Sequence, residues 1–328
     1  MTENSKNLAV VILNWNGKSW LQKFLPGVIQ FSEEAEIYVI DNSSTDDSIE
    51  VLKRKFPSVK IIINDKNYGF AGGYNEGLKK INAEYYCLLN SDVEVTENWI
   101  KPVLNLFVKD SSIAAIQPKI LSFNNRDYFE FAGAAGGFID NLGYPYCRGR
   151  VFDDLEKDKG QYNDETKIFW ASGCCFFIRS KDFWEQKGFD ERFFAHQEEI
   201  DLCWRLINSG KKVFYTGKSR VYHVGGGTLN KQSAQKTFLN IRNNFSMLLK
   251  NLPFPKLIGI IFLRLCLDGA ASFYFAYKNG LSHFWAVLRG HFGFYAQIPE
   301  TLKRRQQYQK SDYYQTKWLI FKHFLGGK

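Results

Sequence analysis

Several features that would indicate a function directly are missing from this sequence of 328 residues. The six cysteines include no CxxC pair, and nothing in their spacing indicates a disulfide framework. The first seven residues are polar, and we recognise no signal peptide in them. We therefore expect reduced thiols and a cytoplasmic protein.

Familiar signatures for nucleic acids and nucleotides are also missing. The net charge of +9, from 43 Lys and Arg against 34 Asp and Glu, would suit nucleic acid, anionic lipid or a phosphorylated substrate. The basic residues are spread along the chain without a nucleic-acid-binding motif, so we expect no nucleic acid partner. The glycine-rich residues 67–77 lack the GKS or GKT of a Walker loop, and their GxxGG spacing differs from the GxGxxG dinucleotide fingerprint.

No apolar run reaches the roughly 20 nearly uncharged residues that span a bilayer. The most apolar segment, residues 257–277, contains Arg264 and Asp268. Apolar residues make up 45% of the chain and aromatic residues 16%, which indicates a globular protein with a large core. The length suits one large domain, or a domain with an extension.

Four strand–helix units are predicted in the first third of the chain. The strands are short apolar runs, followed by polar turns and, after most of them, an amphipathic helix; they lie at residues 8–13, 37–40, 59–63 and 85–89. Repetition of this unit predicts an α/β fold with a mostly parallel sheet and right-handed crossovers. Later runs at 113–116, 129–135 and 169–178 are predicted as further strands.

Polar side chains follow three of the predicted strands. Asn14, Asp41 and Asp92 come where strands end, and the carboxyl edge of such a sheet is where ligands bind. Asp92, beside Asn90 and Ser91, offers oxygen ligands to a divalent cation that can hold a diphosphate. Asp41 offers an acceptor for a base or ribose. Any one of these could be an ordinary polar turn, but the repetition favours a nucleotide site.

Four segments together resemble the family 2 glycosyltransferases, and above all their rhamnosyltransferase-like branch. They are VILNWN at residues 11–16, VIDNSSTD at 39–46, NYGFAGGYN at 67–75 and LNSDV at 89–93. The resemblance covers residues 8–228. It implies a GT-A fold, in which a mostly parallel nucleotide-binding sheet is flanked by helices, and transfer of a sugar from a nucleotide sugar with inversion.

The resemblance also implies a set of binding residues. Those expected to contact the nucleotide sugar are Asn14, Asn16, Asp41, Asn42, Asn67, Gly72, Gly73, Asn75, Asn90, Ser91 and Asp92. His223, after a short strand and before a glycine-rich loop, is expected to complete a Mn²⁺ or Mg²⁺ site with Asp92, although a single histidine is more often structural. Many relatives carry Asp where this chain has Asn90, which is a poorer metal ligand.

Two acidic residues, Glu198 and Glu199, open a predicted helix. Acids at this position commonly stabilise the helix dipole. The resemblance implies more, because the family carries Glu-Asp here and the second acid is its general base. That position is Glu199, one methylene longer than the usual Asp. Asp201 and Arg205 stand in the favourable order for a helix ion pair, so we assign Asp201 to structure.

Trp170, Gly173 and Glu198 are expected to line the acceptor side of the site. We predict a catalytic domain at residues 1–228 and a helical C-terminal extension at 229–328. Within the extension, an aromatic helix at 281–298 is followed by Lys303, Arg304 and Arg305. This pattern suits a helix on an anionic membrane surface, and a cap packed on the catalytic domain or a homodimer contact is the alternative.

These observations predict an inverting, metal-dependent glycosyltransferase. The donor would be a nucleotide-diphosphate sugar such as dTDP-rhamnose or a UDP-sugar. The acceptor would be a hydroxyl of a glycan or lipid-linked acceptor in cell-surface polysaccharide synthesis. A sugar-phosphate nucleotidyltransferase would need a basic glycine-rich loop after the first strand, which residues 14–17 do not provide. A non-catalytic nucleotide-sugar-binding protein on the same fold stays open, because Asn90 and Glu199 depart from the family pattern.

Overall fold

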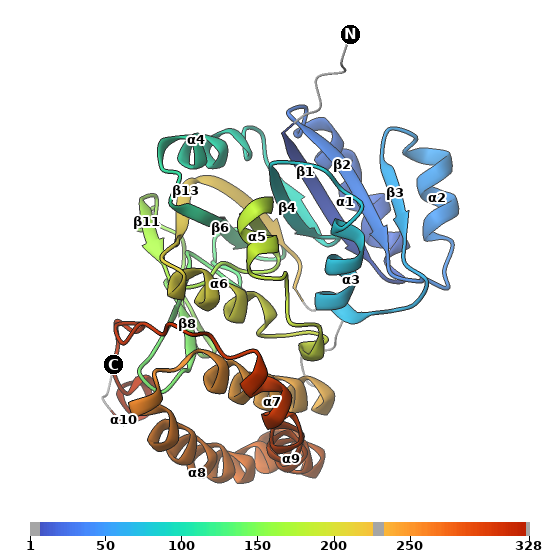
Figure 1. The fold of residues 1–328 in the computed structure, drawn as a ribbon. Helices are drawn as coiled ribbons and strands as arrows, with labels where there is room; N and C mark the ends of the chain where they lie inside the picture. Colours follow the sequence, from blue (N-terminus) through green and yellow to red (C-terminus); the bar gives the residue numbers. More distant parts are fainter. Residues whose placement is uncertain (1–6, 226–232, 326–328) are drawn as a thin grey trace.

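A central nine-stranded sheet and a group of C-terminal helices make up the computed structural model, which describes residues 7–225 and 233–325 (Figure 1). The strand order is β11-β13-β6-β12-β4-β1-β2-β3, with β5 paired beside β13. The predicted N-terminal segment up to residue 6, the glycine-rich residues 226–228 and the predicted domain boundary after 228 lie outside the described residues.

The first half of the sheet confirms the predicted parallel units. Its strands are β1 (Leu8–Asn14), β2 (Ala35–Asp41), β3 (Lys60–Ile63) and β4 (Tyr85–Asn90), and all neighbours in the order β4-β1-β2-β3 run parallel. The helices between them are α1 (Lys18–Gln30), α2 (Ser48–Lys55) and α3 (Gly69–Leu78). Most of β1 and β4 is buried, as near-continuous apolar runs in a parallel sheet require.

The second half of the sheet is mixed. It contains β5 (Val93–Val95), β6 (Ile113–Ser122), β11 (Glu165–Ile168), β12 (Cys175–Arg179) and β13 (Lys212–His223), with α4 (Lys101–Lys109) between β5 and β6. β12 runs antiparallel to both β4 and β6, while β13 runs parallel to β6. The antiparallel β12 inserted between β4 and β6 therefore makes the sheet mixed rather than wholly parallel.

Two strand predictions in this region need correction. Residues 129–135 form a turn with only a bridge at Phe129, because Gly133 and Ala134 adopt positive φ angles of 141° and 43° that a strand excludes. Of residues 169–178, only those from Cys175 onward are in the strand. A small antiparallel sheet that we did not predict lies between these segments; it consists of β7 (Gly137–Ile139), β8 (Pro145–Cys147), β9 (Arg150–Val151) and β10 (Asp154–Leu155).

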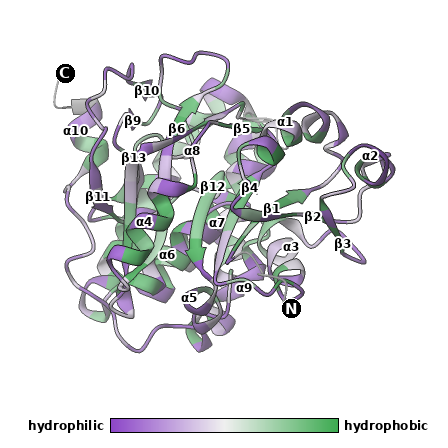
Figure 2. Cartoon of the chain, turned by 90° about the horizontal axis from the view of Figure 1, so that it is seen from above, coloured by the Kyte–Doolittle hydropathy of each residue, from purple (hydrophilic) through white to green (hydrophobic). Residues whose placement is uncertain are grey.

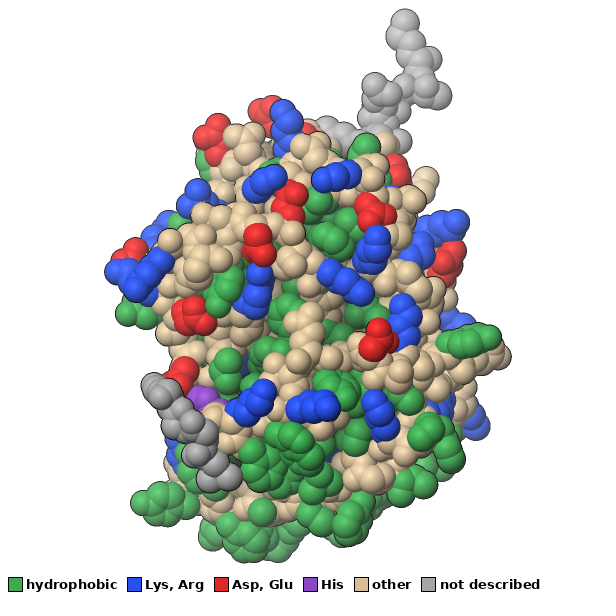
Figure 3. Space-filling model, turned by 90° about the vertical axis from the view of Figure 1, so that its left-hand side faces the viewer, with side chains coloured by type: hydrophobic (Ala, Val, Ile, Leu, Met, Phe, Trp, Pro, Cys, Tyr) green, Lys and Arg blue, Asp and Glu red, His purple; other side chains and the backbone are tan. Residues whose placement is uncertain are grey.

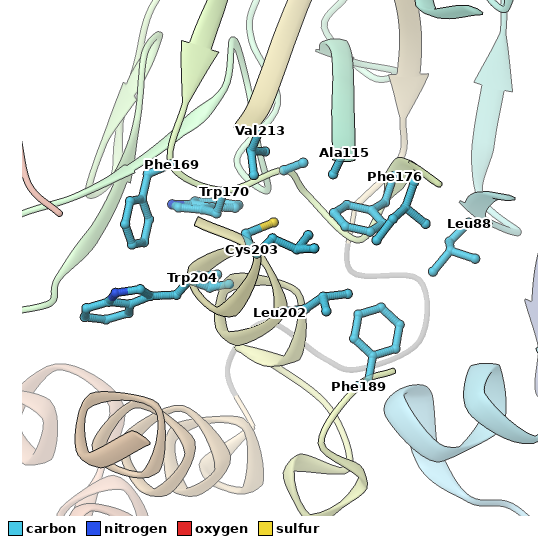
Figure 4. Close-up of a cluster of buried hydrophobic side chains, with 14 of the residues drawn as sticks. Leu88, Ala115, Phe169, Trp170, Phe176, Phe189, Leu202, Cys203, Trp204 and Val213 are labelled. Carbon is cyan, nitrogen blue, oxygen red and sulfur yellow. The ribbon is translucent and has the colours of Figure 1, made fainter. Parts of the chain in front are cut away.

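The helix α6 (Glu198–Asn208) is packed into the core on one face of the sheet. Figure 4 shows Cys203 of this helix beside Trp170, and Trp204 beside Phe169. It is preceded by α5 (Ser180–Glu185) and the 3₁₀ turn η1 (Glu191–Phe193). Hydrophobic residues concentrate on β4, β12 and β6, and hydrophilic residues on the outer loops (Figure 2). The core thereby holds the first turn of α6 against the sheet.

Four helices follow: α7 (Ala234–Asn251), α8 (Phe254–Asn279), α9 (Leu281–Lys303) and α10 (Leu319–Leu325). The C-terminal half of α7 is buried, and α7 packs on α6, α8 and α9. After α9, the chain returns to the small sheet, where Tyr313 Oη donates to Asn141 O and Leu319 N donates to Asp140 Oδ2. The helices are thus fastened to the α/β domain at both ends.

A buried charge network joins α6 to α7. Lys250 Nζ lies 2.9 Å from Asp190 Oδ2 and 2.8 Å from Asp201 Oδ2. Arg205 Nε lies 2.9 Å from the same Asp201 oxygen, which confirms the predicted helix pair. Asn251 Nδ2 donates to the other Asp201 oxygen. All five side chains are buried, so each charge depends on its partners for solvation.

We predict that Lys250→Met lowers the free energy of unfolding by about 3–5 kcal/mol, because it removes one partner of a buried charge network. Urea denaturation measures the change. Lys303→Met is the matched control: Lys303 is exposed beside Glu300, and such pairs contribute about 0–1 kcal/mol. Equal stability of the two variants would show that Lys250 does not hold α7 to α6.

Candidate active site

The carboxyl ends of β4, β1 and β2 lie side by side and bring the predicted polar residues to one edge. The strand register places Asn14 opposite Asp41, and Leu13 opposite Asn90. Asn14 Nδ2 donates to Asp41 Oδ2 at 2.9 Å and to Ser44 Oγ at 3.1 Å. The Asp41 carboxylate is therefore held in place by the end of the neighbouring strand.

Asn16 shapes the loop that follows β2. It has a positive φ of 52°, which asparagine tolerates better than most residues. Its Oδ1 accepts from the backbone N–H of Thr45 at 2.7 Å and of Asp46 at 3.3 Å. Its own N–H donates to Ser44 Oγ. Asn16 and Asn14 thus fix the polar loop that borders the edge.

Asparagines that are predicted to bind the nucleotide sugar form a network of side-chain amides next to α3. Asn42 Nδ2 donates to Asn67 Oδ1 at 2.9 Å and to Gly69 O at 3.0 Å. Asn64, which we did not predict, donates to Asn42 Oδ1 at 3.0 Å. A Cβ at Gly73 would lie 2.9 Å from Asn42 Nδ2, so glycine is needed for α3 to approach this network.

Asn75 and Gly72 also make protein contacts that explain their presence. Asn75 Nδ2 donates to Phe189 O at 3.0 Å, and its Oδ1 accepts from Phe189 N–H at the same distance. A Cβ at Gly72 would lie 2.9 Å from Tyr68 Cβ. The side chain of Asn75 therefore holds the segment before η1 in place. Its contact with the nucleotide sugar stays a prediction.

Asp92 and His223 lie together just beyond β4. The pairing of β13 with β5 places His223 opposite Val93, and His223 Nε2 lies 3.2 Å from Asp92 Oδ1. Burial alone would raise the pKa of Asp92, but its interaction with His223 brings that pKa below its usual value. Asn90 Nδ2 lies 3.4 Å from the same ring nitrogen.

This pair fits a divalent metal of small radius. Adjacent ligands of an octahedral ion at about 2.1 Å lie about 3 Å from one another, and the Asp92–His223 separation is 3.2 Å. Among residues 7–225 and 233–325, no group of three or more His, Cys, Asp and Glu is placed to hold a metal. The described residues therefore provide a pair of ligands, Asp92 and His223.

Glu130 belongs to the same cluster, although the sequence analysis missed it. Its Oε2 lies 3.3 Å from His223 Nδ1, the ring nitrogen that faces away from Asp92. All three side chains are about 95% buried. The only sign of it in the sequence is one carboxylate within the apolar residues 129–135, whose pattern predicts a strand where the structure has a turn.

Glu198 and Glu199 open α6 in different surroundings. Glu198 is 4% exposed, whereas Glu199 keeps partial exposure. Burial raises the pKa of Glu199 to about 6, so this carboxyl is mostly ionised at neutral pH. Burial, reinforced by the neighbouring Glu199, raises the pKa of Glu198 well above its usual value. Of the two acids, Glu199 has the pKa that suits accepting a proton.

The two other residues predicted on the acceptor side lie in different places. A Cβ at Gly173 would lie 3.9 Å from Glu199 Cδ and 3.2 Å from the Phe70 ring, so the Gly173 backbone borders the acid. Trp170 is buried in the core, and its indole N–H donates to Phe138 O at 2.9 Å (Figure 4). Its observed role is packing, and its contact with an acceptor stays a prediction.

Comparison with known proteins places these features in a family. The model described as "Glycosyl transferase family 2" matches residues 9–186, which is more than half of the chain. The N-acetylglucosaminyl-diphospho-decaprenol L-rhamnosyltransferase of Mycobacterium tuberculosis is 23% identical over 66% of this chain and 75% of its own length. The low-salt glycan biosynthesis hexosyltransferase Agl10 of Haloferax volcanii is 24% identical over 73% of this chain and 74% of its own.

Solved structures share the fold. GalNAc-T7 with UDP, GalNAc and Mn²⁺ superimposes with a TM-score of 0.54 and 23% identity, over 68% of this chain and 44% of that one. A mannosyltransferase from Pyrobaculum calidifontis with GDP-Man and Mn²⁺ has the same TM-score, with 11% identity over 90% of this chain and 76% of that one. At these identities the likeness shows a GT-A fold.

Proposed function

The chain belongs to glycosyl transferase family 2, in its rhamnosyltransferase-like branch, and from this premise we propose an inverting, metal-dependent transfer from a nucleotide-diphosphate sugar to a hydroxyl group. The observation that carries the proposal is the buried pair of Asp92 and His223 at the ends of β4 and β13. This pair adjoins the polar strand ends, and the partly exposed residue Glu199 lies in the first turn of the helix packed on the sheet.

The donor would lie over the ends of β1, β2 and β4. Asp41, held by Asn14, is the acceptor for the base or ribose of the nucleotide. Two structural neighbours have UDP or GDP-Man bound together with Mn²⁺, and a relative is a rhamnosyltransferase. We propose dTDP-rhamnose or a UDP-sugar as the donor.

Asp92 and His223 would hold Mn²⁺ or Mg²⁺. When bound, such an ion offsets the negative charge that develops on the departing diphosphate. Asp92 supplies an anionic oxygen and His223 a neutral nitrogen, so the pair leaves positive charge available for the diphosphate. Asn90 Nδ2 lies 3.4 Å from His223 Nε2. Where many relatives have a second carboxylate, this chain therefore has an amide that can form a hydrogen bond next to the pair.

Glu199 would act as the general base. Its carboxylate takes the proton of the acceptor hydroxyl as that oxygen bonds to the anomeric carbon, and the bond from this carbon to the diphosphate breaks. Attack from the face opposite the diphosphate inverts the configuration. Burial, together with the neighbouring Glu199, raises the pKa of Glu198, which disfavours a second negative charge beside the base.

The acceptor is proposed to be a glycan or a lipid-linked saccharide of cell-surface polysaccharide synthesis. A relative's name specifies a diphospho-decaprenol acceptor, and another acts in glycan biosynthesis. Apolar side chains exposed on α8 and α9 support work at a membrane, and we propose its cytoplasmic face. A non-catalytic donor-binding protein is the alternative, and the absence of transfer or donor hydrolysis with intact donor binding would favour it.

We predict that Asp92→Ala abolishes the increase in UDP or dTDP affinity that Mn²⁺ produces, because the variant loses its anionic metal ligand. Titration calorimetry with and without Mn²⁺ measures this increase. Glu94→Gln, which changes a partly exposed acid two residues away that pairs with Arg126, should keep it. Metal-dependent binding to Asp92→Ala at wild-type strength would exclude Asp92 as a ligand.

We predict that Glu199→Gln lowers turnover by about 10²–10⁴-fold, the usual contribution of a general base, while donor affinity is kept. In the wild type, kcat should fall about tenfold per unit as pH drops below about 6, because the base becomes protonated. Steady-state kinetics at saturating substrates measure both effects.

Glu198→Gln is the matched control and should change turnover much less. Glu199→Asp tests the position of the acid: it restores the family's usual residue but withdraws the carboxylate, and a misplacement of about 1 Å can cost about 10²-fold. Wild-type turnover in Glu199→Gln would remove Glu199 from the mechanism and leave Glu198 as the next acid to test.

A further inference from the structure

Helix α8 has its polar face turned toward the protein. Arg264, Asp268 and Ser272, spaced four residues apart, are 5% exposed or less. The Arg264 guanidinium lies 3.6 Å from the centre of the Tyr144 ring and donates to Leu142 O. Tyr144 Oη donates to Asp268 Oδ1 at 2.9 Å. The two charges inside this apolar helix therefore belong to its protein-facing side.

The opposite face of α8 is apolar and exposed. Of its most apolar 18-residue window, only 22% is buried. Ten of the large exposed apolar side chains of α8 and α9 form what we call the apolar base; they are Phe254, Ile258, Phe262, Phe273, Tyr274, Tyr277, Leu281, Trp285, Phe292 and Tyr295. Along α8, no charged side chain is exposed between Lys256 and Lys278.

Basic residues surround this surface. Figure 3 shows hydrophobic side chains covering the end of the molecule where Figure 1 places the C-terminal helices, with a row of Lys and Arg side chains above them. Lys256 and Lys278 stand near the two ends of α8, and Arg289 and Lys303 are exposed on α9. Apolar surface beside cationic side chains complements a leaflet of anionic lipid.

We propose that α8 and α9 insert side-on into one leaflet of an anionic bilayer, with the apolar base in the acyl region and the basic residues at the headgroups. Contiguous exposed apolar patches of this kind are uncommon on soluble monomers. The exposed Trp and Tyr side chains suit the boundary between headgroups and acyl chains. The sequence pattern indicated only the α9 segment, whereas the structure assigns the longer apolar face to α8.

Insertion in the plane fits better than a membrane span. With 26 residues and a mean hydropathy of 1.6 in its best window, α8 is long and apolar enough to cross a bilayer. To do so, it would have to remove Arg264 and Asp268 from Tyr144 and Leu142 and carry both charges into hydrocarbon. Lying in the plane leaves these contacts intact.

Vesicle flotation of the full chain tests the proposal, with phosphatidylcholine vesicles with and without an anionic lipid. We expect binding to anionic vesicles that is weakened, but not abolished, by high salt. Phe262→Ser and Ile258→Ser should each weaken binding about tenfold or more, since each removes a large apolar side chain from the acyl region. Val108→Ser, at an 82% exposed position on α4, is the matched control and should bind like the wild type.

Other outcomes would overturn the proposal. Binding lost entirely at high salt would mean surface attraction without insertion. Unchanged binding of both serine variants would mean that α8 is not inserted. A stable dimer in analytical ultracentrifugation that Phe262→Ser dissociates, without vesicle binding by the wild type, would assign the apolar base to a second copy. Wild-type transfer to a water-soluble acceptor would show that the variants are folded.

A different observation carries a second inference, which rests on the proposed metal site. We infer that Glu130 orients His223 for metal binding as a positioning residue. Its carboxylate lies 3.3 Å from His223 Nδ1, while Nε2 faces Asp92. Histidines that bind metals usually donate their other ring N–H to such a group, which fixes the tautomer and the ring orientation.

The surrounding backbone is shaped around this carboxylate. Ala132 N–H donates to Glu130 Oε2, which holds the acid from within its own turn. Gly225, two residues after His223, has a φ of +74°, and a Cβ there would lie 2.7 Å from Glu130 Oε1. The turn at residues 130–132 and the chain after β13 thus meet at Glu130.

Mn²⁺ affinity, measured by electron paramagnetic resonance in the presence of UDP, tests this inference. Glu130→Gln should weaken Mn²⁺ binding about 10–100-fold, the usual effect of losing such a partner. Glu130→Asp should recover part of the affinity, and UDP binding without metal should stay unchanged. Glu94→Gln is the matched control.

The outcomes separate this inference from the proposed metal site. Wild-type Mn²⁺ affinity in Glu130→Gln, together with weak binding in His223→Ala, would remove only the role of Glu130. Wild-type affinity in His223→Ala would remove the metal site itself, and the inference about Glu130 with it.

Discussion

The buried charges around Asp201 connect the α/β domain to the C-terminal helices. Asp201 accepts from Arg205 on its own helix and from Lys250 and Asn251 on α7. The helix that it anchors begins with Glu198 and Glu199, and α7 packs in turn against α8 and α9. Because unpaired charges are costly in a buried setting, α6 and α7 have little freedom to move apart. The position of Glu199, the proposed general base, is therefore fixed relative to the apolar surface of α8 and α9.

The unequal burial of two adjacent acids follows from how α6 enters the core. Consecutive helical residues differ by about 100° around the axis, so Glu198 and Glu199 cannot both face the same surroundings. Glu198 is buried, and burial, reinforced by Glu199, raises its pKa well above the usual value. Glu199 is partly exposed beside the backbone of Gly173. Two acids that look equivalent in the sequence therefore differ in burial and in the size of the pKa shift that burial causes.

The sequence was sufficient for what depends on local pattern. The apolar runs predicted β1 and β4 as buried strands, and the structure confirms both. The spacing of Asp201 and Arg205 predicted an ion pair within one helix, and this pair is also present. Residues 129–135 were misread because apolar composition does not report the positive φ of Gly133. Glu130 was missed because its partner, His223, is 93 residues away along the chain and meets it only through tertiary packing.

The candidate donor residues show a related limit. Asparagine is common both in ligand sites and in clamps between loops, because its amide donates and accepts at once. Asn42 and Asn75 fill the second role in this structure, with hydrogen bonds to Gly69 and Phe189. A motif can thus include residues that build the site as well as residues that would touch the ligand. Sequence alone does not separate these roles, because both require the same residue at the same position.

The charges of α8 show how burial can reverse the meaning of a residue. In the sequence, Arg264 and Asp268 interrupt an apolar run and count against a membrane segment. In the structure, both charges have partners on the protein side, namely Tyr144, Leu142 and each other. Each charge that faces inward leaves one fewer polar group on the outward face. The same residues that argue against a span therefore leave the continuous apolar face that a helix needs to lie in a membrane surface.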